Sequence, residues 1–126
     1  IVLLDLDYFK TVNDDHGHQT GDRVLQSIPA LLAPHLRHQD VLARWGGEEF
    51  IFWLPETSGS DARQLSERLR HILANARFCH DIRLTGSFGV AACQPGEGLE
   101  QVIQRADHCL YQAKQQRNTV VAELTK

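Results

Sequence analysis

Residues 41–54 read Val41-Leu42-Ala43-Arg44-Trp45-Gly46-Gly47-Glu48-Glu49-Phe50-Ile51-Phe52-Trp53-Leu54. Two short apolar and aromatic runs, 41–45 and 50–54, flank the glycine pair Gly46-Gly47. Such runs are typical of strands, and glycine at their junction permits a sharp turn between them. This stretch therefore predicts a β-hairpin whose tip carries Gly-Gly-Glu-Glu.

Three further strands are predicted outside the hairpin. Residues 1–6 are almost continuously apolar until Asp5 and Asp7, which indicates a buried strand that ends at a polar site. Residues 82–92 and 120–124 also show strand patterns. We expect the strand over residues 1–6 to lie beside the hairpin, because acidic side chains then gather at one edge.

Helices are predicted between these strands. Apolar side chains recur at helical spacing in three segments, over residues 24–36, 61–76 and 99–113. We expect residues 13–21 to form a polar loop before the first helix. Pro29 removes a backbone donor, so it should bend that helix, which we expect to end near Pro34 or Leu36.

The predicted order is strand, helix, hairpin, helix, strand, helix and strand. This order favours an α/β fold of the α+β class, with helices on one side of a mainly antiparallel sheet. A ferredoxin-like core is the natural arrangement. The 126 residues suffice for one hydrophobic core, so we expect a single domain over 1–126.

Composition narrows the possible partners and compartments. The formal net charge of -3 argues against a general nucleic-acid or membrane surface, because such binders carry clustered positive charge. The three cysteines form no C-x-x-C pair, which favours a reducing cytoplasm. No apolar run reaches membrane-spanning length. The chain begins at Ile1 within a predicted strand, so we expect it to be part of a longer polypeptide.

Acidic residues at the first strand and the hairpin suggest a metal site. Asp5 and Asp7 are two residues apart, so they point to one face of an extended chain. Magnesium prefers hard oxygen ligands and usually takes one or two protein carboxylates, which Asp5 and Glu48 would supply. The glycine pair would let a nucleotide approach closely. Gly-Gly-Glu-Glu alone fits an ordinary acidic turn equally well.

Several segments together resemble the GGDEF-domain family. They occur in the family's order and cover nearly the whole chain: Leu4-Asp5-Leu6-Asp7-Tyr8-Phe9-Lys10, Asn13-Asp14, Gly17-His18-Gln19-Thr20-Gly21-Asp22, Arg44-Trp45-Gly46-Gly47-Glu48-Glu49-Phe50, Ser87-Phe88-Gly89-Val90-Ala91, Arg105-Ala106-Asp107 and Leu110-Tyr111-Gln112-Ala113-Lys114. The resemblance implies a ferredoxin-like catalytic domain related to the palm of nucleotidyl cyclases and polymerases. It also implies diguanylate cyclase activity, the condensation of two GTP molecules into cyclic di-GMP with release of two pyrophosphates.

The resemblance assigns roles to particular residues. Asp5 and Glu48 would be catalytic and would hold two Mg²⁺ or Mn²⁺ ions with the Leu6 carbonyl, and Glu48 would help to deprotonate the attacking hydroxyl. The implied GTP-binding residues are Phe9, Lys10, Asn13, Asp22, Gly47, Lys114 and Arg117. Within this set, Asn13 and Asp22 would read guanine, whereas Phe9, Lys10, Lys114 and Arg117 would meet the phosphates. Because each such domain holds one GTP, the working enzyme would be a homodimer.

A second ligand site is implied by Arg37-His38-Gln39-Asp40. It matches the family's R-x-x-D motif shortly before the glycine pair, at which the product inhibits the enzyme. Arginine can hold phosphate or a guanine edge bidentately, and aspartate can accept from the base. Arg68 matches a supporting arginine, so we expect feedback inhibition by cyclic di-GMP. The alternative is a solvated helix end with incidental charge.

Two departures from the family pattern leave rival interpretations open. The expected Lys-x-x-Gly-Arg-Asn appears as Lys114-Gln115-Gln116-Arg117-Asn118, one residue short and without its glycine. The family's opening helix is not found before Ile1, so we expect an upstream regulatory domain and, through it, any anchoring at the inner membrane. One rival is a non-catalytic module that senses GTP or cyclic di-GMP. Another is a related nucleotidyltransferase making a mixed dinucleotide, against which Asp22 argues.

Overall fold

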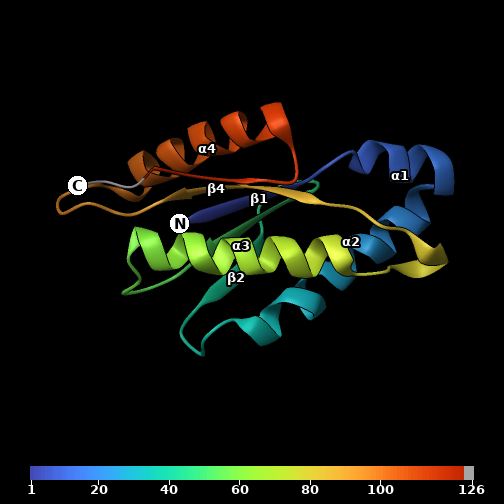
Figure 1. Ribbon diagram of the computed structural model, residues 1–126, viewed down its shortest axis with the longest axis horizontal. Helices are drawn as coiled ribbons and strands as arrows, with labels where there is room; N and C mark the ends of the chain where they lie inside the picture. The colour runs from blue at the N-terminus through green and yellow to red at the C-terminus, as the bar shows by residue number, and fades with distance from the viewer. Residues whose placement is uncertain (124–126) are drawn as a thin grey trace.

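The computed structural model describes residues 1–123, which form strands on one sheet and helices around it (Figure 1). The elements in chain order are β1 (Val2–Leu6), α1 (Phe9–His16), α2 (His18–Leu32), β2 (Val41–Arg44), β3 (Glu49–Trp53), α3 (Gly59–Asn75), β4 (Gly86–Ala91), α4 (Leu99–Gln116) and β5 (Val120–Glu123). Short 3-10 turns follow α2 at Ala33–His35 and precede β4 at Cys79–Asp81.

The sheet confirms the ferredoxin-like prediction. Its strand order is β2-β3-β1-β4-β5, and the first four strands have the order expected of that core. β1 pairs antiparallel with both β3 and β4, and only β5, which joins β4, makes a parallel pair within residues 1–123. The central position of β1 explains its continuous apolar run, because both of its faces are covered.

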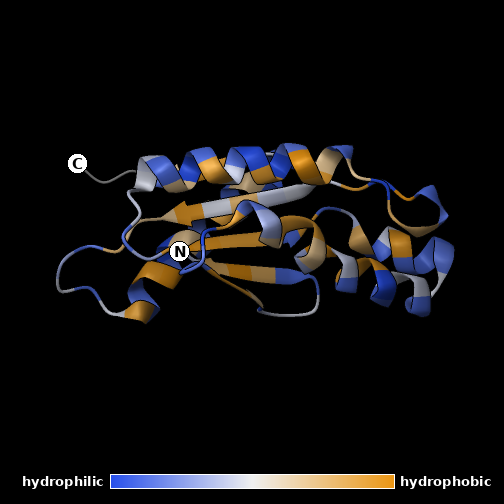
Figure 2. Cartoon of the chain, turned by 90° about the horizontal axis from the view of Figure 1, so that it is seen from below, coloured by the Kyte–Doolittle hydropathy of each residue, from blue (hydrophilic) through white to orange (hydrophobic). Residues whose placement is uncertain are grey.

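The helices lie on both faces of the sheet, so the prediction that they lie on one side was wrong. Val2, Leu4 and Leu6 of β1 face the larger core, which α2 and α3 cover. Leu3 faces the other way and packs with Val102, Ala106 and Leu110 of α4. Figure 1 shows α3 and α4 on opposite sides of the strands, and Figure 2 shows the largely apolar colouring of the central strands. The core on the α4 face contains few buried residues, so the apolar pattern of the sequence offered little sign of a second covered face.

Gly89 allows α4 to approach the sheet closely. A Cβ at Gly89 would lie 2.2 Å from the carbonyl oxygen of Ala106 and 2.4 Å from the Leu110 nitrogen. Backbone atoms of α4 therefore rest almost directly on β4, and any larger residue at Gly89 would push the helix away. This contact fixes where the end of α4 meets β1.

The hairpin prediction is confirmed to within one residue. Arg44 pairs with Phe50 and Val41 with Trp53, so β2 and β3 run side by side with the glycine pair between them. The backbone N–H of Trp45 and the carbonyl of Glu49 close the turn at 2.8 Å. Glu49 also lies opposite Asp5 of β1, which brings the hairpin tip to the end of the first strand.

Three predicted boundaries were wrong or fall outside the described chain. Residues 13–21 are helical rather than a loop, because α1 ends at His16 and α2 begins at His18 around Gly17, which has φ of 87°. The fourth strand starts at Gly86, not at residue 82; Ile82 and Leu84 are buried but belong to a connection. Leu124 of the last predicted strand lies outside the described residues. No helix over residues 1–123 is long and apolar enough to cross a membrane.

Candidate active site

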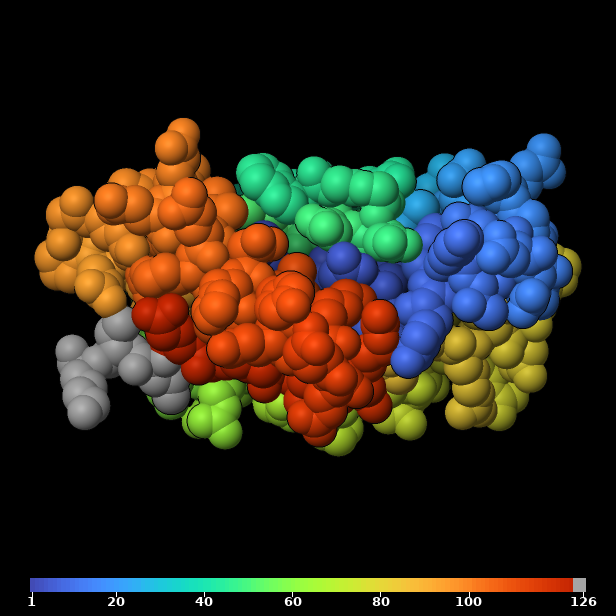
Figure 3. Space-filling view, turned by 90° about the horizontal axis from the view of Figure 1, so that it is seen from above, coloured from blue at the N-terminus to red at the C-terminus, as the bar shows by residue number. Residues whose placement is uncertain are grey.

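A cleft of about 480 Å³ opens where β1 ends, between the hairpin, α1 and the end of α4. The space-filling view shows β1 between these three elements (Figure 3). The lining includes residues that the family resemblance assigned to metal, catalysis or phosphate: Asp5, Leu6, Phe9, Lys10, Glu48, Lys114 and Arg117. Tyr8 and Thr11, which sequence reasoning did not assign, also line it. The fold therefore gathers residues more than a hundred positions apart.

Lys114 lies against the oxygen atoms expected to hold metal. Its Nζ is 3.1 Å from Asp5 Oδ1, and it donates to the carbonyl oxygens of Asp5 and Leu6 at 3.1 and 3.2 Å. A positive charge thus already occupies the space between the Asp5 carboxylate and the Leu6 carbonyl. Hard oxygens arranged around a cation are the ligands that Mg²⁺ prefers.

The two glutamates of the hairpin tip lie in a crowded acidic environment. Partial burial raises the pKa of Glu48 above its ordinary value, and the neighbouring Asp5 charge raises it further, against the opposing effect of Lys114. Burial, followed by Asp5 and Asp107, likewise raises the pKa of Glu49. Acidic groups therefore crowd this edge of the cleft, where a bound cation would reduce their mutual repulsion.

The donor set fits a divalent metal, although it is small. Among residues 1–123, no three His, Cys, Asp or Glu side chains converge as ligands. Magnesium commonly uses only one or two protein carboxylates and takes its remaining ligands from water and substrate phosphate. Asp5, Glu48 and the Leu6 carbonyl are compatible with that chemistry.

Asp7 is a buried anchor of the site that sequence reasoning left unassigned. Its Oδ1 accepts from Ser87 Oγ at 2.7 Å and Lys114 Nζ at 2.9 Å. Its Oδ2 accepts from Thr85 Oγ1 at 2.6 Å and the Asn118 N–H at 2.8 Å. Burial alone would raise the pKa of Asp7, but these hydrogen bonds outweigh it and lower the pKa. Asp7 thereby ties Lys114 and the end of α4 to β4.

Arg117 reaches the cleft even though its motif is one residue short. It ends α4 with a left-handed φ of 65°, the conformation that a glycine would adopt most readily. Its guanidinium carbon lies 4.4 Å from the centroid of the Tyr8 ring. Its nearest acidic neighbour is Asp7, with Nη1 3.8 Å from Oδ1. The missing residue has not turned this side chain away from the cleft.

The two predicted guanine-reading residues lie on adjoining helices and outside the cleft lining. Asn13 of α1 packs on α2, since a Cβ at Gly21 would be only 1.9 Å from Asn13 Oδ1. Asp22 follows Gly21 and is exposed. Helix α1, which carries Asn13, also contributes Lys10 and Thr11 to the cleft. The predicted guanine-reading residues are therefore close to the cleft in the fold.

The tip glycine Gly47 is likewise outside the lining, and it is held by Arg44. The Arg44 Nε donates to the carbonyl oxygens of Gly46 and Gly47 at 3.1 and 3.0 Å, and Nη2 donates to Gly47 at 2.6 Å. A Cβ at Gly47 would meet nothing within 4 Å. Arg44 therefore fixes the turn and leaves the outer side of Gly47 open to a ligand.

The residues of the predicted product site share a second cavity of about 240 Å³. Arg37, Asp40 and Arg68 line it, with Thr57 and Asp61 among the neighbours. Arg37 pairs bidentately with Asp40, through Nε to Oδ2 at 3.3 Å and Nη2 to Oδ1 at 3.0 Å. Its Nη2 also donates to the Thr57 hydroxyl. The structure thus brings the three residues together, with the first two paired to each other.

Comparisons with known proteins identify the family. The family model described as "Diguanylate cyclase, GGDEF domain" matches residues 1–119. Diguanylate cyclase DgcP of Pseudomonas aeruginosa is 45% identical over 117 residues, which are 90% of this chain and 17% of that protein. The response regulator PleD of Caulobacter vibrioides is 39% identical over 129 residues, covering 97% of this chain and 28% of that protein. The chain therefore spans less than a third of either relative.

A solved structure with the same fold is the active GGEEF domain of a diguanylate cyclase from Vibrio cholerae. It superposes with a TM-score of 0.91 and 30% identity over 99% of this chain and 82% of that chain. The fold, the family match and the hairpin motif agree. This chain belongs to the GGDEF family of diguanylate cyclase domains.

Proposed function

We propose that the chain is the catalytic domain of a diguanylate cyclase that condenses two GTP molecules into cyclic di-GMP. The observation that carries the proposal is the cleft in which Asp5, Glu48, Lys10, Lys114 and Arg117 meet. It combines acidic oxygens suited to divalent metal with cations suited to a triphosphate. Phosphoryl transfer relies on this combination of positioning and charge.

Each group has a proposed task in the reaction. The 3′-hydroxyl oxygen of one GTP forms a bond to the α-phosphorus of the other, the bond from that phosphorus to the bridging oxygen breaks, and pyrophosphate leaves. Glu48, whose pKa is raised, accepts the hydroxyl proton. Lys114 and Arg117 offset charge on the leaving phosphates. Asp5, Glu48 and the Leu6 carbonyl would hold two Mg²⁺ or Mn²⁺ ions, which would supply further charge neutralisation when bound.

The start of α1 supports phosphate binding. Tyr8, its N-cap residue, makes no side-chain cap hydrogen bond, so the N–H groups of Phe9 and Lys10 are available at the edge of the cleft. Helix N-termini bind phosphate through such groups. We assign guanine recognition to Asn13 and Asp22, and close approach of the nucleotide to Gly47.

We propose that two copies of the domain face each other, since each cleft would hold one GTP and both new bonds need a partner. The domain would work in the cytoplasm without nucleic acid, and any membrane attachment would come from other parts of the protein. The GGDEF domain of DgcB from Caulobacter crescentus, 34% identical with a TM-score of 0.88, was solved in complex with cyclic di-GMP. That complex supports binding of cyclic di-GMP by a domain of this fold. We assign product binding in this chain to Arg37, Asp40 and Arg68, which share one cavity, and propose that the bound product inhibits synthesis.

The direct test is incubation of the purified protein with GTP and Mg²⁺, followed by chromatographic separation of the nucleotides. Asp5→Asn and Glu48→Gln serve as matched controls, because each removes a negative charge with little change in size. We expect cyclic di-GMP from the unchanged protein alone. Tight binding of GTP or cyclic di-GMP without any product would favour the non-catalytic sensor, and a mixed dinucleotide from GTP and ATP would favour the other nucleotidyltransferase.

A further inference from the structure

We propose that Tyr8 is a positioning residue that holds Arg117 at the phosphate end of the cleft through a cation–π contact. The Arg117 guanidinium lies 4.4 Å from the centroid of the Tyr8 ring, and both residues line the cleft. This inference rests on the proposed function, because it assumes that Arg117 meets the phosphates of GTP.

The Tyr8 side chain is presented to the cleft by an unusual backbone. Tyr8 lies between β1 and α1 with a left-handed φ of 56°, a conformation that costs energy for a residue with a side chain. It is 65% exposed, so the ring adds little to the core. A tyrosine in this place is therefore not explained by packing.

The backbone under Arg117 is fixed from two sides. Arg117 and Asn118 both have positive φ, of 65° and 46°. The Asn118 N–H donates to Asp7 at 2.8 Å, and Arg70 Nη1 donates to Asn118 Oδ1 at 3.0 Å. The backbone after α4 is thus held in place. These contacts do not restrain the long side chain of Arg117.

Asp7 is poorly suited to supply that restraint. Its two carboxylate oxygens already accept from Thr85, Ser87, Lys114 and the Asn118 N–H, all within 2.9 Å. Arg117 approaches Asp7 only to 3.8 Å. Within residues 1–123, the Tyr8 ring is the remaining close partner of the guanidinium.

A ring restrains a guanidinium without using its N–H groups. The donors of Arg117 then stay available for phosphate oxygens, while the side chain loses less freedom when the nucleotide binds. A cation–π contact at an exposed site contributes enough to change affinity about two- to fivefold. The effect should concern the β- and γ-phosphates and not the rest of the nucleotide.

The test measures binding of a GTP analogue with a methylene group between the α- and β-phosphates, which cannot release pyrophosphate, beside GMP. We expect Tyr8→Leu to weaken binding of the analogue about two- to fivefold and to leave GMP binding unaltered. Tyr8→Phe keeps the ring and should retain the affinity for the analogue. Tyr111→Leu removes a tyrosine that is 67% exposed on α4, and it serves as the matched control.

A double-mutant comparison separates positioning from direct contact. In the Arg117→Ala background, Tyr8→Leu should have no further effect on the analogue. Equal affinity of Tyr8→Leu and the unchanged protein, or an undiminished Tyr8→Leu effect without Arg117, would overturn the inference. Thermal unfolding shows whether each variant is folded.

Synthesis of cyclic di-GMP from GTP is measured separately. Failed catalysis with the expected binding pattern would reject the cyclase proposal alone. No binding of the analogue by the unchanged protein would reject both proposals.

Discussion

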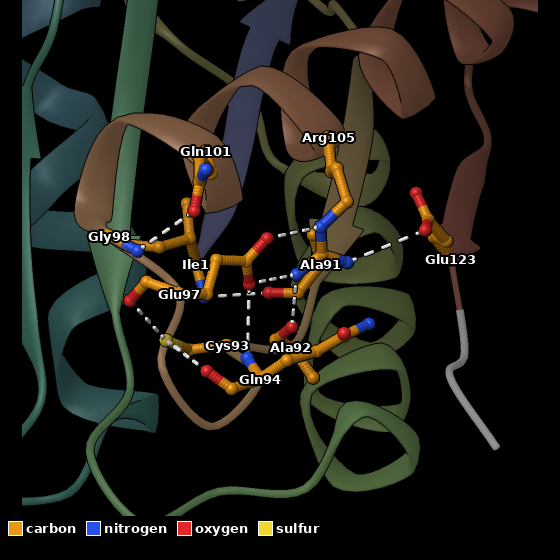
Figure 4. A network of polar contacts seen from close by, with 10 residues as sticks. All are labelled: Ile1, Ala91, Ala92, Cys93, Gln94, Glu97, Gly98, Gln101, Arg105 and Glu123. Carbon is orange, nitrogen blue, oxygen red and sulfur yellow. Dashed lines mark hydrogen bonds and ion pairs between the residues drawn. The ribbon is translucent and has the colours of Figure 1, made fainter.

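Helix α4 carries a basic residue at each of two acidic clusters, and the two clusters differ in how well charge is matched. Toward its start, Arg105 donates to Glu97 at 2.8 Å and to the Ala92 carbonyl at 2.6 Å, and pairs with Glu123 at 3.5 Å (Figure 4). At its end, Lys114 meets Asp5 and Asp7 at 3.1 and 2.9 Å. The first cluster connects α4 to the preceding loop and to β5, and the second adjoins the cleft.

The pKa values of two glutamates, one beside each basic residue of α4, are shifted in opposite directions. The hydrogen bond from Arg105 lowers the pKa of Glu97, as expected where an acid has a dedicated cation. Burial and the Asp5 charge instead raise the pKa of Glu48 beside Lys114. Acidic groups whose pKa is shifted by burial and by a neighbouring like charge are common at functional sites. Because Lys114, Asp5 and Glu48 also line the cleft, we infer that the Lys114 cluster is functional and the Arg105 cluster structural.

The largest expected effect comes from removing Asp7, which connects the functional cluster to the core. Asp7→Ala should lower the free energy of unfolding by about 3–5 kcal/mol, because Ser87 and Lys114 lose a buried charged partner. Urea unfolding measures it. Asp107→Ala, at an exposed position on α4, is the control and should change little. A loss below about 1 kcal/mol at Asp7 would contradict the assigned role.

The second effect concerns catalysis. Lys114→Ala should lower kcat/KM for cyclic di-GMP formation about a hundredfold per folded molecule, since the cation that we propose to face the leaving phosphates is lost. Gln115→Ala, at the neighbouring exposed position, should retain the rate. Equal rates for both variants would remove Lys114 from the reaction.

The third effect concerns the second cavity. Arg68→Ala should raise the concentration of cyclic di-GMP needed for half-inhibition about tenfold, because the cavity loses a charged hydrogen-bond donor that we propose to bind the product. Arg63→Ala changes an exposed arginine of the same helix that does not line the cavity, and should leave inhibition as it is. Unaltered inhibition in Arg68→Ala would argue that the product binds elsewhere.

The smallest effect is expected in the Arg105 cluster, where a substitution should change stability and not synthesis. Arg105→Gln should lower the Tm by roughly a few degrees at neutral pH while synthesis per folded molecule stays within about twofold. Since the pKa of Glu97 is lowered, the pair stabilises the fold above the ordinary value of 4.5 and loses this contribution as the pH falls through the lowered pKa. The Tm difference should therefore shrink in acid. A difference that grows in acid would contradict the assigned pairing.

The sequence predicted the elements that have strong periodicity. The hairpin, α3 and α4 were found because their apolar residues alternate or recur over a buried face. α1 was missed because it buries only Phe9 and Val12, so its helix depends on packing against α2. Ile82 and Leu84 imitated a strand because both are buried, yet the ladder with β1 begins only at Gly86.

The candidate site was predicted through its motifs and missed where only tertiary contacts matter. Asp5, Glu48 and Lys114 belong to recognisable segments and do meet in the cleft. The role of Asp7 depends on Thr85 and Ser87, about 80 positions away, so no local pattern could indicate it. The contact of Tyr8 with Arg117 likewise depends on where α4 ends. Two features of the sequence could have indicated the contact between Tyr8 and Arg117. Tyr8 precedes the predicted phosphate-binding residues Phe9 and Lys10, and the motif that contains Arg117 is one residue short.

Synthesis of cyclic di-GMP is tested by the ratio of pyrophosphate released to cyclic di-GMP formed when the purified protein is given GTP and Mg²⁺. We expect two pyrophosphates for each cyclic di-GMP, because each of the two new bonds expels one. GTP that remains unreacted, or that yields GDP and phosphate without any dinucleotide, would contradict this expectation.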